Sequence, residues 1–162
     1  MKRTMTVLVL LSVVFVPVFM GQGMDLGLRV ATQSPSFAIQ AEVDVTSSLS
    51  VGLFFEFTPD TIADLVAFQT PSFTIGLTTK YHATLFIPAL APYLGVEGAL
   101  NLPLTETPMS LGILFGLRVY PLRNIYVFAE AVTPILPLAN APRWDDVGTW
   151  FKDFYLGIGF RI

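Results

Sequence analysis

Side chains that could carry out catalysis are few in this sequence. His82 is the only histidine, and there is no cysteine. A hydrolase acting on lipid would need a serine, a histidine and an acid together, on a face that lipid reaches. His82 falls on the polar side of the strand that we predict around it, and no serine is an evident partner. We therefore predict no catalytic residue and a protein that is not an enzyme.

Metal and cofactor chemistry have as little support. One histidine without cysteines offers no recognisable ligand spacing for a transition metal. Asp145, Asp146 and Asp153 have the oxygen ligands that calcium prefers, but an acidic loop in water accounts for them better. The glycines recur at strand spacing and not as GxGxxG, which is the nucleotide fingerprint. We predict no metal site and no cofactor.

Charged residues are arranged more regularly. Each of eight predicted strands has one on its polar face near or within the expected membrane depth, and four are positive and four negative. They are Arg29, Glu42, Glu56, Lys80, Glu97, Arg118, Glu130 and Arg161. Isolated charges in a low-dielectric interior are very costly, whereas paired charges are tolerated. We therefore predict a network of paired charges in a narrow lumen. The alternative is a chance scatter of charges on the wet face of a soluble sheet.

The elements that must position these charges are clearest in the segment 109–132. From Met109 to Val119 every second residue is apolar, which is the period of a strand with one apolar face. The opposite face has glycines and Arg118. The segment 121–124 has a turn composition, after which the alternation resumes. This pattern predicts an antiparallel hairpin.

The same alternation predicts eight strands along the chain. Their bounds are 24–32, 37–45, 49–57, 73 to about 85, 93–101, 109–120, 125–132 and 151–162, with 87–92 as a turn. An even number of strands of this length suits an all-β, eight-stranded, antiparallel up-and-down transmembrane barrel. Eight strands enclose a space only wide enough for side chains to fill.

Apolar residues on the outward faces are expected to touch lipid. The hairpin and the final strand give the clearest examples, which are Leu111, Ile113, Phe115, Leu117, Leu156, Ile158 and Phe160. The composition agrees with this interpretation. The 162 residues are 53% hydrophobic and 13% charged, whereas an ordinary soluble domain is about 25% charged.

The amino terminus has the features of an export signal. Two basic residues precede an apolar core, and small residues precede a cleavage position after Gly23. A membrane-anchoring helix is the alternative, but the core contains Pro17 and has about 16 residues, short of the ~20 that a spanning helix needs. We predict a signal peptide at 1–23 and a barrel at 24–162. The mature part is acidic, which argues against a nucleic-acid partner.

Two stretches resemble a known family. The strand–turn–strand GLRVYPLRNIYVFAEA and the last strand, FYLGIGFRI, are similar to small eight-stranded outer-membrane barrels of the OmpA and OmpX kind. Members commonly end in an aromatic residue, whereas here Phe160 stands two positions before the final Ile162. The resemblance implies outer-membrane localisation, contact with outer-membrane lipid and assembly by the barrel-insertion machinery.

A barrel fold alone does not decide function, because this group includes anchors, adhesins, pores, carriers and lipid-modifying enzymes. We expect a non-enzymatic integral outer-membrane protein, either structural or a narrow passive channel with a charge-paired, filled lumen. One alternative is a barrel that binds or transports a small hydrophobic molecule at its mouth, under the loop 133–150. Another is a soluble periplasmic barrel of lipocalin type, in which the faces are inverted and the charges meet water.

Overall fold

The computed structural model describes residues 23–33, 36–59, 72–83, 87, 89–102, 108–136, 151 and 153–162. The predicted signal peptide lies outside these residues except for Gly23, and so do Asp145, Asp146 and most of the loop 133–150. The strands are β1 (Met24–Ala31), β2 (Phe37–Asp44), β3 (Leu49–Thr58), β4 (Ser72–His82), β5 (Leu90–Leu102), β6 (Met109–Leu122), β7 (Ile125–Leu136) and β8 (Asp153–Arg161). Among the described residues, no helix is long and apolar enough to span a membrane.

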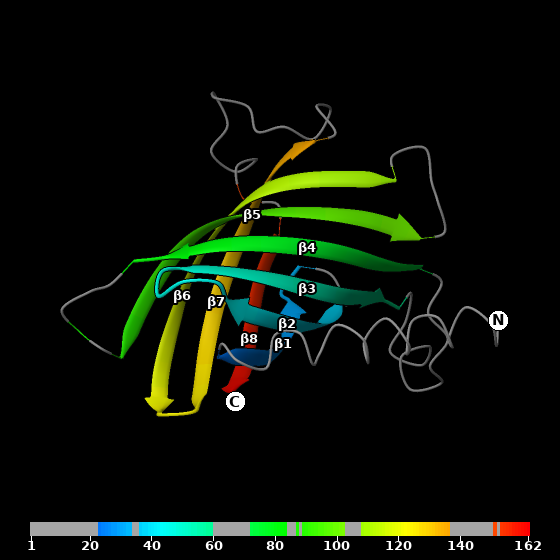
Figure 1. The fold of residues 1–162 in the computed structure, drawn as a ribbon. Coiled ribbons are helices and arrows are strands. Elements are labelled where there is room, and N and C mark those ends of the chain that lie inside the picture. Colours follow the sequence, from blue (N-terminus) through cyan, green and yellow to red (C-terminus); the bar gives the residue numbers. More distant parts are fainter. Residues whose placement is uncertain are drawn as a thin grey trace.

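The strands close into a barrel. Each strand pairs antiparallel with the next one in sequence, and β8 pairs with β1 to complete the circle. Figure 1 shows this junction, where β8, in red, lies beside β1, in blue. Closure removes the free edges that an open sheet would expose. The predicted all-β, antiparallel, eight-stranded up-and-down architecture is confirmed.

The connections differ between the two ends of the barrel. At one end, β2 joins β3 through 45–48, and β6 joins β7 through Arg123 and Asn124. The start of β1 and the end of β8 also meet there, because Ile162 N donates a hydrogen bond of 2.9 Å to the carbonyl of Met24. We call this the short-turn end. The opposite end, where β1 leads to β2, β3 to β4, β5 to β6 and β7 to β8, is called the loop end.

One strand begins earlier than the sequence suggests. The turn predicted at 87–92 is wrong for its last residues, because β5 begins at Leu90 and Pro92 lies opposite Leu117 of β6. Pro92 still uses its carbonyl, which accepts a hydrogen bond of 2.9 Å from Ala83 N. It occupies the first rungs of the strand, where the missing N–H donor of a proline is tolerated.

Another strand ends later than the sequence suggests. We predicted a loop from residue 133, but β7 continues to Leu136. The pairing shifts here, because Gly112 lies opposite Pro134 while Leu111 lies opposite Leu136. One residue of β7 therefore has no partner on β6, and the strand forms a bulge next to Pro134. Prolines are tolerated at such bulges because the ladder of hydrogen bonds is already interrupted there.

The alternation along each strand separates buried residues from exposed ones. In β6, Leu114 and Arg118 are 0% and 1% exposed, whereas Phe115 and Leu117 are 44% and 39% exposed. Large exposed apolar side chains occur on every strand from β1 to β8. The barrel therefore has a polar and aromatic interior and an apolar exterior, which is the reverse of a water-soluble sheet.

Aromatic rings fill much of the lumen by lying over glycines of the neighbouring strand. The opposed pairs are Phe54–Gly76, Tyr93–Gly116, Phe128–Gly157 and Tyr126–Gly159. A Cβ atom at Gly116 would lie 2.1 Å from Cζ of Tyr93, a separation that close-packed atoms do not reach. Glycine at these positions therefore makes room for the rings.

Candidate functional site

The lumen holds a network of ion pairs, and Arg29 of β1 forms its loop-end part. The Arg29 side chain is fully buried. Its Nη1 atom lies 3.0 Å from Oε2 of Glu97 and 3.1 Å from Oε2 of Glu130. Its Nη2 atom lies 3.4 Å from Oε2 of Glu56. One guanidinium thus reaches carboxylates on β3, β5 and β7.

Lys80 of β4 connects the two halves of the network. Its Nζ atom lies 2.6 Å from Oε1 of Glu130 and 3.1 Å from Oε2 of Glu42. Glu130 also accepts a hydrogen bond of 2.8 Å from the hydroxyl of Tyr93. All four side chains are buried, so the ammonium and the two carboxylates must compensate each other's charge where water cannot.

The network continues through Arg118 of β6 to the short-turn end. Nη2 of Arg118 donates to Oε2 of Glu42 at 2.6 Å, and Nη1 donates to Oδ2 of Asp25 at 2.8 Å. Asp25 also accepts a hydrogen bond of 2.8 Å from Nε of Arg161. The Nη2 atom of Arg161 lies 3.1 Å from Oδ2 of Asp44, where the network reaches the rim.

These contacts form one continuous chain of alternating charge. In order it contains Glu56, Arg29, Glu130, Lys80, Glu42, Arg118, Asp25, Arg161 and Asp44, with Glu97 joined at Arg29. Six carboxylates therefore share four basic groups in this part of the chain. Arg29 pairs across the lumen because the residues opposite it on β2 and β8 are Ala38 and Gly157. Asp25 and Asp44 are members that the sequence analysis missed, although each shares the parity of a predicted member of its own strand.

His82 lies beside this network and does have a serine neighbour. Its Nε2 atom is 2.9 Å from Oγ of Ser50 and 3.2 Å from Oε1 of Glu42. The expectation of no serine partner is therefore wrong, and the cause is the β3–β4 register, which puts Ser50 opposite Lys80, two residues from His82. In a catalytic triad the acid binds the ring nitrogen that does not face the serine. Here Glu42 and Ser50 share one nitrogen, and Ser50 is 0% exposed. The three residues therefore form a hydrogen-bonded group without the geometry of a catalytic triad.

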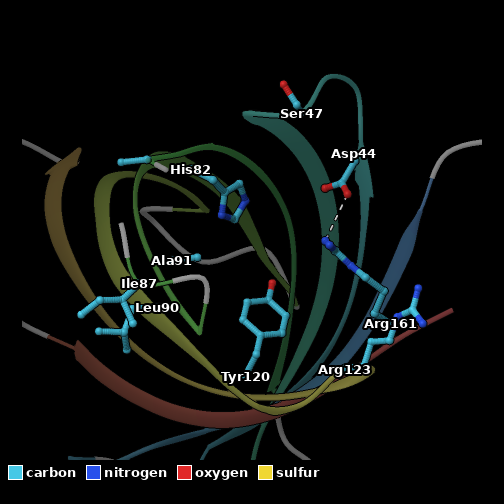
Figure 2. Close-up of a pocket in the computed structure, with 10 residues that line it drawn as sticks. Asp44, Ser47, His82, Ile87, Leu90, Ala91, Tyr120, Arg123 and Arg161 are labelled. Carbon is cyan, nitrogen blue, oxygen red and sulfur yellow. Dashed lines mark hydrogen bonds and ion pairs between the residues drawn. The ribbon is translucent and has the colours of Figure 1, made fainter. Parts of the chain in front are cut away.

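Two cavities lie at the ends of the lumen. One, of about 310 Å³, is at the loop end and includes Glu56, Glu97 and Leu136 in its lining. The other, of about 400 Å³, is at the short-turn end and is drawn in Figure 2. Buried side chains, among them Lys80 and Arg118, occupy the lumen between them. Within the described residues, no group of three or more His, Cys, Asp or Glu could hold a metal ion.

Comparison with known proteins shows which solved structures this barrel resembles. No protein-family model matches the chain, and no curated protein matches its sequence. A de novo designed transmembrane β-barrel superposes with a TM-score of 0.57 at 12% identity, covering 88% of this chain and 96% of that one. The N-terminal β-barrel domain of OprF from Pseudomonas aeruginosa gives 0.55 at 13% identity, covering 86% and 96%. The outer-membrane protein Ail of Yersinia pestis gives 0.50 at 12% identity, covering 87% and 98%.

The chain has the fold of small eight-stranded outer-membrane barrels. The resemblance seen in the sequence is confirmed at this level. Sequence identities near one in eight show the fold alone, so the substrates and partners of these proteins cannot be assigned to this chain.

The residues that we expected to face lipid lie on the outside of this barrel to different degrees. Phe115, Leu117, Leu156, Ile158 and Phe160 are exposed. The other two, Leu111 and Ile113, are half-buried. Leu111 lies beside the β7 bulge and also lines the loop-end cavity, so the irregular register explains its partial cover.

Proposed function

We propose that the protein is a non-enzymatic, integral outer-membrane barrel with a structural role, whose lumen is closed by the ion-pair network. The observation that carries this proposal is the reversed polarity of the barrel. Exposed aliphatic and aromatic side chains occur on all its strands, while seven charged residues are less than one tenth exposed, namely Asp25, Arg29, Glu42, Lys80, Glu97, Arg118 and Glu130.

An apolar exterior of this kind is suited to lipid and not to water. Soluble monomers rarely expose contiguous apolar patches of more than a few hundred Å², whereas a transmembrane barrel presents an apolar band to the acyl chains. A lipocalin-type barrel would need the apolar residues inside and the charges outside. The buried position of Arg118 beside the exposed Leu117 is the opposite arrangement, and it favours the membrane proposal.

Closure of the lumen follows from packing and from charge. Eight strands leave room only for side chains, and here bulky groups such as Tyr126, Leu114 and Arg118 are 0–1% exposed. Each basic group between the cavities contacts at least one carboxylate, so a passing ion would have to separate pairs that water does not screen. This supports a structural barrel over an open pore.

The proposal has consequences for the partners and for biogenesis. Outer-membrane lipid would contact the apolar exterior, and the barrel-insertion machinery would assemble the chain after export. The signal peptide proposed at 1–23 and the alternating final strand support this route. A small hydrophobic ligand at the mouth stays the alternative, and it depends on the loop 133–150, of which only 133–136 is described.

Membrane fractionation combined with gel migration tests the proposal. The expressed chain should be recovered with the outer membrane, and unheated samples should migrate differently from boiled ones, because a closed barrel resists unfolding by detergent at room temperature. Copurified apolar lipid in the folded fraction would favour the ligand-binding alternative. Recovery in the soluble periplasmic fraction would contradict the proposal.

A further inference from the structure

The cavity at the short-turn end is lined by charged and apolar side chains, and closure of the lumen gives this cavity no role. It lies between the β2–β3 turn, β4, the start of β5, the end of β6 and the β6–β7 turn, and β8. Its volume of about 400 Å³ falls within the range of about 300–1,000 Å³ that small-molecule sites have. Figure 2 shows side chains from several of these elements surrounding it.

One wall of the cavity is cationic. Arg161 is held in place, because its Nε and Nη2 atoms both donate to Asp25, at 2.8 and 3.2 Å. The neighbouring Arg123 lies in the β6–β7 turn, whose Asn124 carbonyl accepts a hydrogen bond of 2.8 Å from Arg161 N. Among the described residues, Arg123 forms no hydrogen bond or ion pair. Its positive charge, exposed at the edge of the cavity, is therefore not paired with a carboxylate of the described residues.

A hydroxyl donor also lines this cavity. The Tyr120 hydroxyl points toward the middle of the residues drawn in Figure 2. His82 adds no free donor, because its Nε2 atom faces Ser50 and Glu42 and the other nitrogen of a neutral ring is an acceptor. The lining carboxylate, Asp44, is bound by Arg161. The cavity thus offers a hydroxyl donor and positive charge, while its carboxylate is already paired.

The opposite wall is apolar. Ile87, Leu90 and Ala91 form it, and Figure 2 shows them across the cavity from Arg161 and Arg123. Ile87 is 55% exposed, so this wall has apolar surface left to cover. Cations on one side and aliphatic groups on the other match a ligand with one anionic end and one apolar end.

We propose that this cavity binds a small amphiphilic anion, namely a carboxylate carrying a short apolar group. The carboxylate lies against Arg123 and the outer edge of Arg161, and the Tyr120 hydroxyl donates to it. The apolar group lies on Ile87 and Leu90. The ion-pair network beneath is left intact, so this site is independent of whether the lumen is closed.

Binding of benzoate to the refolded barrel in nanodiscs tests this site. In ¹⁵N-labelled protein, benzoate should cause saturable shifts in the backbone amides of Tyr120, Arg123 and Arg161. Benzamide has the same shape without the charge, and acetate has the charge without the ring, so each should bind about tenfold more weakly or worse. Arg123→Gln should weaken benzoate about tenfold, and Leu90→Ser should weaken benzoate but leave acetate unchanged.

A matched control separates a local site from overall charge. Arg143→Gln removes the same charge from the segment between β7 and β8 and should leave benzoate affinity unchanged. The proposal is overturned if benzoate gives no saturable shifts, if benzamide binds as tightly, or if Arg143→Gln weakens binding as much as Arg123→Gln. Heat-modifiable migration checks that each variant folds, and the three wild-type titrations decide the matter even where a variant does not.

Discussion

Arg29 illustrates how much of the site a sequence can predict at the scale of the residue. The period-two alternation indicates which charges share a face, because successive side chains of a strand point to opposite sides. It does not indicate the partners. Arg29 and Glu130 are 101 positions apart, and their contact exists only once the barrel has closed. Asp25 and Asp44 were missed because one charge was assigned to each strand, whereas the network places two on β1 and two on β2.

Lys80 allows a test of the network at the same scale. Its loss would leave six carboxylates facing three arginines, so Lys80→Met should destabilise the barrel by about 3–5 kcal/mol, the cost of breaking a buried pair. Adding Glu130→Gln should recover part of this loss, because it removes one of the carboxylates left without its cation. Urea unfolding in detergent micelles, followed by gel migration, measures both.

The matched control for this experiment is Arg123→Gln. Arg123 is exposed and outside the network, so its replacement should change stability by no more than about 0.5 kcal/mol. If the effects of Lys80→Met and Glu130→Gln simply add, the two residues do not stabilise each other, and the network is weaker than its distances indicate.

At the scale of the element, strand cores were predictable and strand ends were not. A run of alternating residues predicts a strand wherever one face is buried. Two of the misplaced ends involve prolines, Pro92 at the start of β5 and Pro134 at the bulge of β7. A rule based on the sequence alone ends a strand at a proline. In the barrel, however, a proline is accommodated wherever the neighbouring strand does not need its N–H donor. That tolerance depends on register, which single-strand periodicity does not contain.

The glycine–aromatic pairs give the prediction at this scale. Gly116→Ala would bring a Cβ to 2.1 Å from Tyr93 Cζ, and Tyr93 is held by its hydrogen bond to Glu130. Overpacking of this kind costs about 1–3 kcal/mol. Gly98→Ala is the control, because a Cβ there meets its nearest neighbour, a Leu111 carbon, at an ordinary 3.9 Å. Urea unfolding should separate the two variants, and equal midpoints would show that the rings do not need the glycines.

The whole molecule combines an apolar exterior with an interior filled by paired charges and aromatic rings. Its closure could be predicted from the even number of strands, because an up-and-down sheet of eight can pair its last strand with its first. The plugging of the lumen could be predicted only in outline. Strand number sets the width of the lumen, but the position of the plug between two cavities depends on which side chains meet there, such as Arg118 with Glu42 at 2.6 Å.

Planar-bilayer conductance tests the plug directly. Arg118 is 1% exposed, and its Cζ atom lies 4.7 Å from the centre of the Tyr126 ring and 5.3 Å from that of Tyr93. Wild-type protein should give silent traces. Arg118→Ala removes a large side chain between the cavities and leaves Asp25 and Glu42 with one cation fewer, so it should give small, cation-selective steps.

The control for conductance is Arg123→Ala, which removes the same charge from the rim and should stay silent like the wild type. A steady wild-type current would contradict a closed lumen outright. Silent traces from both wild type and Arg118→Ala would show that Arg118 does not hold the lumen shut, and the rings of Tyr93 and Tyr126 would then have to close it without the guanidinium between them. The same preparation distinguishes these outcomes from misfolding, because only a closed barrel shifts its migration on boiling.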